Sequence, residues 1–205
     1  MTSEVRRRPG GRSARVREAV LRAALEVISE SGPSGFRIAE IAARADVHES
    51  SIYRRWGTRD RLTIDALLSH SEDTLKVPDT GSIHGDLVEL GQALVRYGTS
   101  PLGAAISRTM ASSIDDEASA QMRTEFWEAR HTAVMVLVDR AKRRGELSDV
   151  VDGRRLIEVF ISPIHFRLLL TRESIDDQYL DNLALIAIHG TSGSAASKGP
   201  SSARG

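Results

Sequence analysis

Residues 36–56, FRIAEIAARADVHESSIYRRW, decide the fold of this chain. In the first half of this stretch, apolar residues recur at steps of three and four, which places them on one face of a short helix: Ile38, Ile41, Ala42 and Ala45. Asp46 and Val47 break the pattern, and a second short amphipathic pattern runs to Trp56. Two short helices joined by such a tight turn predict a helix-turn-helix unit, whose second helix enters the major groove of DNA.

The turn and the outward face fit this interpretation. The corner of the motif commonly takes a glycine because its backbone adopts a positive φ, and aspartate at position 46 tolerates that conformation better than most residues. Val47 and Ile52 are spaced to anchor the second helix, and the small Ala42 suits the closest approach of the two helices. The remaining side chains are free to contact base edges and phosphates: Glu49, Ser50, Ser51, Tyr53, Arg54 and Arg55.

Residues from about 15 to 62 resemble the DNA-binding domain of the tetracycline-repressor (TetR) family. Three positions depart from the family pattern: Asp46 replaces glycine, His48 replaces the serine or threonine that caps the recognition helix, and Arg37 replaces a threonine near the start of the second helix. Histidine is a poorer N-cap than serine. These departures concern the detailed contacts rather than the fold. The matching residues are Ala23-Ala24, Gly32, Glu40-Ile41-Ala42, Val47, Ile52-Tyr53-Arg54-Arg55-Trp56 and Thr58-Arg59-Asp60-Arg61-Leu62.

The resemblance implies a ligand-responsive, sequence-specific transcriptional regulator, most often a repressor, that binds double-stranded DNA at a palindromic operator. It further implies that a small molecule binds in a C-terminal helical domain and that the chain forms a homodimer through its last two helices. Tyr53 and Arg59 are expected to hold phosphates, and Arg59 resembles the family's phosphate-contacting basic residue. We expect Glu49, Ser50, Ser51 and Arg54 to read bases, with Arg37 and Arg55 as further DNA-contact candidates.

Composition and charge agree with a DNA-binding segment joined to a different domain. Residues 1–62 carry 13 arginines and 8 acidic residues, whereas the rest carries 15 basic and 20 acidic residues, so a charge of +5 is followed by one of −5. A basic segment of this kind is the electrostatic footprint of nucleic-acid binding. The 205 residues contain no cysteine, which excludes disulfides, thiolate catalysis and cysteine-ligated metals. No apolar stretch is long enough to span a membrane, and we expect a cytoplasmic protein.

The predicted organisation has four parts. Residues 1–11 form a disordered basic arm, which either follows DNA phosphates or the minor groove or remains a solvated tail. Residues 12–62 form the DNA-binding domain, 63–189 the regulatory, ligand-binding and dimerisation domain, and 190–205 a disordered Gly/Ser-rich tail. Residues 76–82, KVPDTGS, are the predicted hinge between the domains.

The fold class is predicted to be all-α with about nine helices, because no segment shows sustained period-two alternation. After the helix-turn-helix unit, helices are expected at residues 59–75, 83–97, 101–113, 115–144, 152–170 and 175–189. The first of these is expected to contact both domains. Proline at position 163 should kink or interrupt its helix. The long helix 115–144 is expected to bury Met122, Phe126, Ala129, Ala133, Val136 and Val138.

The last two predicted helices carry a broad apolar surface that one domain of this size has little means of covering. We expect these residues to pack against the same helices of a second chain. They are Leu156, Phe160, Ile164, Leu168, Leu169, Leu180, Leu183, Ala184, Ile186 and Ile188.

No catalytic motif stands in the sequence: it has no glycine-rich phosphate loop, no Gly-x-Ser-x-Gly elbow and no metal-binding spacing. We therefore expect no enzyme, no cofactor and no metal. Two other interpretations remain, a structural protein that binds DNA without sequence preference and a helical ligand-binding enzyme with a similar corner. The ratio of specific to non-specific affinity would separate the first from a specific regulator.

Composition also suggests where a ligand would bind. Trp127 and His131 lie four residues apart on one face of the long helix, and His165 follows Pro163 on another. An apolar wall with a few polar groups is typical of a ligand pocket, although ordinary core packing would give the same pattern. The candidates are Trp127, His165, His131, Phe126 and Met135; Arg108 is a weaker one, and Arg167 lies either at the surface or beside an acid.

Overall fold

A computed structural model describes residues 11–32, 35–111 and 117–193, and these residues form nine α-helices and one π-helical turn, without a strand. The all-α prediction is therefore confirmed. The helices are α1 (Arg12–Ser31), α2 (Ile38–Arg44), α3 (Glu49–Trp56), α4 (Arg59–Thr74), α5 (Ile83–Thr99), α6 (Pro101–Ala111), α7 (Glu117–Arg143), α8 (Gly153–Phe166), the π turn η1 (Arg167–Thr171) and α9 (Asp177–Gly193).

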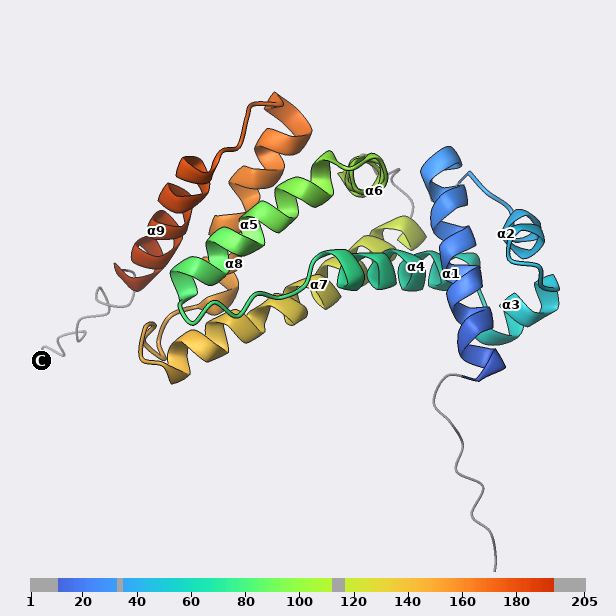
Figure 1. Ribbon diagram of the computed structural model, residues 1–205, viewed down its shortest axis with the longest axis horizontal. Helices are drawn as coiled ribbons and strands as arrows, with labels where there is room; N and C mark the ends of the chain where they lie inside the picture. The colour runs from blue at the N-terminus through green and yellow to red at the C-terminus, as the bar shows by residue number, and fades with distance from the viewer. Residues whose placement is uncertain (1–10, 33–34, 112–116, 194–205) are drawn as a thin grey trace, which may run out of the picture.

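The helices form two groups, which are joined where α4 packs against α7 (Figure 1). α1, α2 and α3 lie at one end of the molecule, and α9 lies at the other. α4 packs against α1 on one side and against α7 on the other, so it belongs to both groups. α5 packs against α6, α7, α8 and α9 in the larger group. As predicted, the fourth helix connects the two parts.

The first group is a three-helix unit with a small apolar core. Ala24 of α1, Ile41 of α2 and Ile52 of α3 are almost completely buried against one another and the start of α4. Asp46 at the corner has a φ of 53°, the conformation expected for this turn. The Val47 N–H then donates to the carbonyl oxygen of Ala42 at 3.0 Å, which closes the turn before α3 begins.

Two helices begin at the residues expected from the sequence, and each start carries a side-chain cap. The Thr58 hydroxyl accepts a hydrogen bond from the backbone N–H of Arg61 at 3.1 Å, and α4 begins at the next residue. The Ser100 hydroxyl accepts from the backbone N–H of Gly103 at 3.1 Å, and proline occupies the first position of α6. Both caps satisfy N–H groups that a helix start leaves without an internal partner.

The C-terminal helices differ from the prediction in two places. α8 runs through Pro163 as one element, so of the two alternatives predicted there, a kink or an interruption, the interruption does not occur. The ladder widens later instead, in η1, where the Arg172 N–H donates to the Arg167 carbonyl oxygen at 2.8 Å. α9 continues to Gly193, so residues 190–193 are the end of a helix rather than part of a tail. Residues 1–10 and 194–205, most of the predicted arm and tail, lie outside the described residues.

The buried face of α7 also differs from the prediction. Ala129 is exposed, and Ala133 and Val136 are half-buried, whereas Arg130 lies in the buried stripe. A charged residue within that stripe concealed it in the sequence and shifted the predicted face onto the neighbouring alanines. The side chain of Met122 lies outside the described side chains. The buried residues are Phe126, Arg130, Val134, Leu137, Val138 and Ala141.

Much of the apolar surface assigned to a second chain is instead the core of this one. Six of the ten predicted residues are buried within the chain: Leu156, Phe160, Ile164, Leu180, Leu183 and Ala184. The large apolar side chains that remain exposed on α8, η1 and α9 share only Ile186 with the predicted set. We call them the α8–α9 face: Val159, Phe166, Leu170, Leu185 and Ile186.

The predicted hinge at residues 76–82 is fastened to its surroundings. The Arg140 guanidinium donates to the Pro78 carbonyl oxygen at 2.7 Å, and the buried carboxylate of Asp86 accepts from the Thr80 N–H at 2.6 Å. The segment is thus held to both α7 and α5. None of the helices in the described ranges is both long enough and apolar enough to cross a membrane.

Candidate functional site

Two regions of the structure carry candidate functional residues: the exposed face of α3 and a cavity in the larger group of helices. On α3, Ile52 and Trp56 point inward, and the opposite face is open. The side chains of Glu49, Ser50, Tyr53, Arg54 and Arg55 are exposed, and Ser51 is half-buried. Five of the six residues predicted to face outward on this helix are therefore exposed, and Ser51 is only partly so.

Two side-chain hydrogen bonds fix the orientation of α3. The Trp56 indole N–H donates to the Asp65 carboxylate of α4 at 3.1 Å, which ties the end of α3 to α4. The Arg55 guanidinium donates to the hydroxyl of Ser13, at the start of α1, at 3.1 Å. Arg55 therefore braces α3 against α1, whereas Arg54 beside it is exposed.

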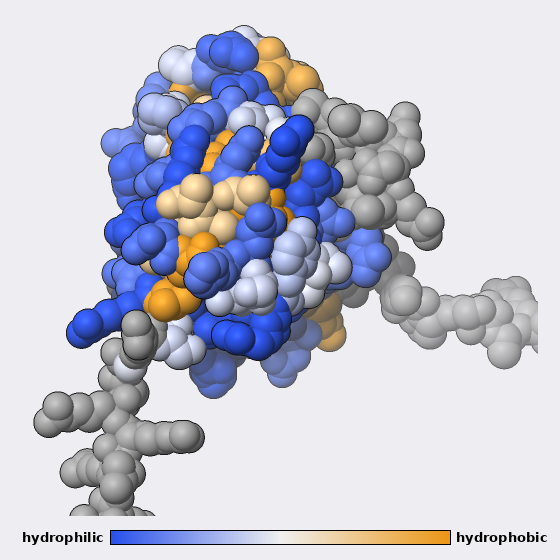
Figure 2. Space-filling model, turned by 90° about the vertical axis from the view of Figure 1, so that its right-hand side faces the viewer, coloured by the Kyte–Doolittle hydropathy of each residue, from blue (hydrophilic) through white to orange (hydrophobic). Residues whose placement is uncertain are grey.

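Arg37 and Arg59 flank α3 on neighbouring elements. Arg37 precedes α2, is exposed, and its backbone N–H donates to the Glu40 carboxylate at 3.4 Å. Arg59 is half-buried at the first residue of α4, with its guanidinium 5.7 Å from the centre of the Phe36 ring. Figure 2 views this end of the molecule and shows a mostly hydrophilic face with a small apolar patch. Polar and basic groups on a protruding helix can contact a DNA groove.

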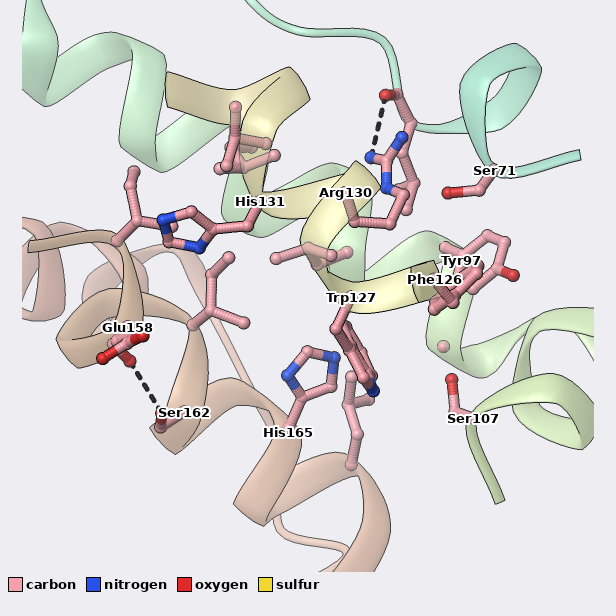
Figure 3. Close-up of a pocket in the computed structure, with 18 of the residues that line it drawn as sticks. Ser71, Tyr97, Ser107, Phe126, Trp127, Arg130, His131, Glu158, Ser162 and His165 are labelled. Carbon is pink, nitrogen blue, oxygen red and sulfur yellow. Dashed lines mark hydrogen bonds between the residues drawn. The ribbon is translucent and has the colours of Figure 1, made fainter. Parts of the chain in front are cut away.

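The second region is a cavity of about 300 Å³ lined by α4, α5, α6, α7 and α8. The wall is mainly apolar, with polar groups at separate points (Figure 3). Four of the five sequence candidates line it: Phe126, Trp127, His131 and His165. The rings of Trp127 and His165 meet edge to face, with centroids 5.5 Å apart, so α7 and α8 contact each other across the cavity.

Met135 does not line the cavity, contrary to expectation. A helix turns about 100° per residue. Val134 therefore lies within about 20° of the direction of Trp127, whereas Met135 is turned away by about 80°. Val134 is a lining residue, and the end of the Met135 side chain lies beside Gly153 at the start of α8.

The two arginine candidates also lie elsewhere. Arg108 is exposed on α6, beside a separate groove. Arg167 pairs with an acid, which was one of the two predicted alternatives: its guanidinium lies 3.3 Å from the Glu173 carboxylate and 3.7 Å from the centre of the Tyr179 ring.

Sequence reasoning missed the most polar part of the cavity. Ser71 of α4, Tyr97 of α5 and Arg130 of α7 line it and are all buried. Arg130 follows Trp127 by three residues, a helical spacing that could have indicated it. Its burial could not be predicted, because a charged side chain on a helix usually lies in water. Ser71 and Tyr97 had no motif to mark them.

Burial shifts the pKa values of several of these groups. It raises the pKa of Tyr97 to about 12, against a smaller opposing effect of the Arg130 charge. It lowers the pKa of His165, because the charged imidazolium loses its hydration. Burial also lowers the pKa of Arg130. At neutral pH the Tyr97 hydroxyl is thus a neutral hydrogen-bond donor, and His165 is uncharged.

α4 connects the two regions directly. Arg59 stands at its first residue, next to the DNA-contact candidates, and Ser71 lines the cavity in its last turn. The Arg61 guanidinium lies 3.3 Å from the Glu125 carboxylate of α7, which adds a polar link beside the apolar packing of α4 on α7. In the described ranges, no three histidines or carboxylates gather as metal ligands would.

Comparison with known proteins agrees with this two-part structure. The sequence matches the family model described as "Bacterial regulatory proteins, tetR family" over residues 20–66, and "Tetracyclin repressor-like, C-terminal domain" over residues 77–186. The HTH-type transcriptional regulator AqdR of Rhodococcus erythropolis is 38% identical over 75% of this chain and 74% of its own length. The uncharacterized HTH-type transcriptional regulator YdeS of Bacillus subtilis is 31% identical over 88% of this chain and 92% of its own.

A similar fold occurs among solved structures. The crystal structure of the TetR family transcription regulator SCO0332 superposes with a TM-score of 0.71 at 25% identity, and it covers 85% of this chain and 97% of its own. The similarity extends over both groups of helices and the connection between them.

Proposed function

The chain belongs to the tetracycline-repressor (TetR) family of helix-turn-helix transcriptional regulators, and on this basis we propose that it is a homodimeric repressor released from a palindromic operator by a small molecule. Its relatives are regulators of transcription and not enzymes. The proposed repressor acts on chromosomal DNA in the cytoplasm.

One observation carries the proposal: a single helix, α4, takes part in both candidate sites. Its N-terminal end follows α3 directly, and its C-terminal turn contributes Ser71 to the cavity wall. A ligand that changes the position of the last turn of α4 would therefore also move α3. Because α4 is fastened to α3 by Asp65 and Trp56, such a movement is carried to the DNA-binding face as a unit.

On the DNA side, the proposal assigns phosphate contacts to Tyr53 and Arg59. Arg59 lies at the start of α4, where backbone N–H groups also favour an anion. Glu49, Ser50, Ser51 and Arg54 are the proposed base readers, because they occupy the open face of α3. Arg37 and Arg55 are assigned supporting roles at the edges of this face.

The proposed dimer forms through the α8–α9 face. Its five apolar side chains are exposed on one protomer, and a second copy would cover them by the same surface on a two-fold axis. Two α3 helices held in this way would reach major-groove half-sites about one DNA turn, roughly 34 Å, apart or a multiple of that distance. A two-fold protein requires a palindromic operator.

Release follows from a shift between two populations. A ligand that binds more tightly to a protomer pair with its α4 helices splayed would disfavour the spacing that the operator needs. For a tenfold loss of DNA affinity, the ligand must prefer the splayed state by about 1.4 kcal/mol.

The test is selection of bound duplexes from a random DNA pool by the purified protein at about 150 mM salt, where phosphate contacts alone give weak binding. The expected result is enrichment of one palindrome. Binding that fades with salt and enriches no sequence would contradict the proposal and would indicate a non-specific DNA-binding protein. The final rounds of selection are then repeated with cell extract from the source organism and with the same extract freed of small molecules. A difference in the amount of bound operator shows whether a ligand opens or closes the dimer.

A further inference from the structure

Three polar side chains on the cavity wall end in buried atoms that have no hydrogen-bond partner among the described residues. They are the Ser71 hydroxyl oxygen, the Tyr97 hydroxyl oxygen and Nε2 of His131. Leaving such an atom buried and unpaired is unfavourable, and most buried polar atoms in folded proteins are paired. Ser71 is only 1% exposed and Tyr97 only 7%, so bulk water does not satisfy them fully.

Arg130 adds a positive charge to the same part of the wall. The residue is 9% exposed, and its guanidinium donates a long hydrogen bond, 3.4 Å, to the Leu75 carbonyl oxygen. Leu75 lies one helical turn after Ser71, so this bond places the guanidinium close to the serine. Figure 3 shows Arg130, Ser71 and Tyr97 on the same side of the cavity, with Trp127 and His165 next to them.

No carboxylate within the described structure forms an ion pair with Arg130. The charge of Glu72, in the last turn of α4, acts on Arg130, but the Glu72 side chain is exposed. Arg154, the other arginine of the cavity wall, is different: its guanidinium lies 2.7 Å from the Glu128 carboxylate and 3.0 Å from that of Glu158. The net charge of the wall is therefore positive, and it is concentrated at Arg130.

We propose that the cavity binds a small organic acid, with its carboxylate or equivalent anionic group against Arg130, Tyr97 and Ser71 and its apolar body against the faces of the Trp127 and His165 rings. This inference rests on the proposed function, since it names the class of molecule that the repressor senses. All three side chains can donate hydrogen bonds, and arginine can only donate, so an acceptor with negative charge suits the set.

The rest of the wall explains the apolar body. Away from Arg130, Tyr97 and Ser71, the cavity is lined mainly by apolar side chains. They include Leu90, Leu94, Ile106, Phe126, Val134 and Ile157. The edge-to-face contact of Trp127 with His165 leaves ring faces for a flat or chain-like molecule to pack against. His165 is uncharged at neutral pH, so the anion's partner is Arg130 rather than this histidine.

The experiment compares matched acids and neutral amides by calorimetry on the full-length protein. The probes are 2-naphthoate with 2-naphthamide and decanoate with decanamide, and 2-naphthylmethylamine serves as the cation. The expected result is that an acid binds at least roughly tenfold more tightly than its amide, the gain typical of a charged hydrogen bond. If no acid of either pair is preferred, or if the cation binds most tightly, the inference is wrong.

Two variants with the same substitution test the role of Arg130. Arg130→Met should weaken acid binding at least roughly tenfold, to the level of the amide, and leave amide binding within about twofold. Arg108→Met removes an exposed arginine outside the cavity and should change neither. Retention of the acid preference in Arg130→Met would overturn the inference. The melting temperature of the ligand-free Arg130→Met protein should not fall, because an uncompensated buried charge is removed.

Tyr97→Phe and Ser71→Ala provide an independent reading if Arg130→Met does not fold. Each removes one donor and should weaken acid binding several-fold without changing amide binding by a similar factor. Equal losses for acid and amide would contradict the assigned position of the anionic group. The selected operator distinguishes the two proposals: specific DNA binding without any preference for acids contradicts this inference alone, whereas failure to select an operator contradicts the proposed function.

Discussion

At the scale of single residues, Asp46 occupies a turn position that commonly takes glycine. Its φ of 53° lies in a region that side chains other than glycine, asparagine and aspartate rarely adopt. We expect Asp46→Gly to raise the free energy of unfolding by about 0.5–1 kcal/mol, because relief of strain exceeds the added chain entropy of glycine. Asp46→Ala should lower it by a similar amount. Urea unfolding measures the free energy of unfolding of both variants. A change in the same direction for the two would contradict the strain argument.

His165 makes a pH-dependent contribution to stability. Burial lowers its pKa in the folded protein below the usual value of 6.5, so the unfolded chain binds the proton more readily. Stability attributable to this residue is therefore complete above pH 6.5 and declines as the pH falls through and below that value. The pKa of His70 is also lowered by burial and acts in the same direction. We expect the melting temperature of His165→Gln to fall less than that of the native protein between pH 7.5 and 5.5; equal falls would refute the assignment.

Arg54 and Arg55 are adjacent but differ in what they contact. Arg55 bonds to Ser13 of α1, whereas Arg54 is exposed on the open face of α3. Arg54→Ala should relax the base preference at one operator position by about 1–3 kcal/mol. Arg55→Ala should instead weaken binding to all sequences alike, through a less well-fixed α3. Competition binding with single-base operator variants separates the two patterns, and interchanged patterns would show that the roles are reversed.

At the scale of helices, Asp86 joins three segments. Its fully buried carboxylate accepts from the N–H and the hydroxyl of Thr80, at 2.6 and 2.8 Å, and lies 3.5 Å from the Arg144 guanidinium. Asp86→Ala should lower the free energy of unfolding by about 3 kcal/mol, because it removes both hydrogen bonds to Thr80 and one of the two carboxylates that pair with Arg144.

Asp79 provides the control for this prediction. Its carboxylate lies 3.5 Å from Arg140 in the same connecting segment but is 61% exposed. Asp79→Ala should therefore cost less than about 1 kcal/mol. Chemical unfolding of both variants gives the comparison, and a similar loss for the two would show that the burial of Asp86 is unimportant.

Helix positions were predictable from the sequence because local signals specify them. Thr58 and Ser100 cap α4 and α6, which begin at the expected residues, and Gly57, with a φ of 74°, ends α3. At Pro163 the sequence allowed either a kink or an interruption, because a proline removes one ladder bond. Here the Ser162 hydroxyl donates to the Glu158 carbonyl oxygen at 2.7 Å, and the helix continues. Whether such a hydrogen bond forms depends on local geometry, which the spacing of residues in the sequence does not reveal.

The cavity was only partly predictable for a related reason. Trp127, His131 and His165 stood out as aromatic and imidazole groups on helix faces, and the structure brings them to one cavity. Arg130 and Tyr97 could not be assigned, since the sequence does not show which polar residues the packing of five helices encloses. The same enclosure misled the assignment of the buried face of α7.

At the scale of the whole molecule, the proposed dimer depends on the α8–α9 face. Three of its large apolar side chains are mostly exposed to water, which is energetically unfavourable. Phe166 is 53% exposed, Leu170 71% and Ile186 61%. α9 lies at the end opposite α2 and α3, so pairing there leaves both DNA-binding faces open (Figure 1). A second copy on this face would turn two weak half-site contacts into one stronger interaction.

Ile186→Glu tests this assembly, because the side chain is exposed and its replacement should leave the protomer folded. We expect the native protein to sediment as a dimer and Ile186→Glu as a monomer, since a pair of facing carboxylates cannot be desolvated without large cost. Affinity for the full operator should fall by at least roughly a hundredfold, and affinity for a half-site should not change. Val150→Glu, which changes a side chain that is 70% exposed in the turn after α7, should remain dimeric. If Ile186→Glu still sediments as a dimer, the two-fold contact must lie elsewhere, and the spacing of the two α3 helices would have to be derived from that other surface.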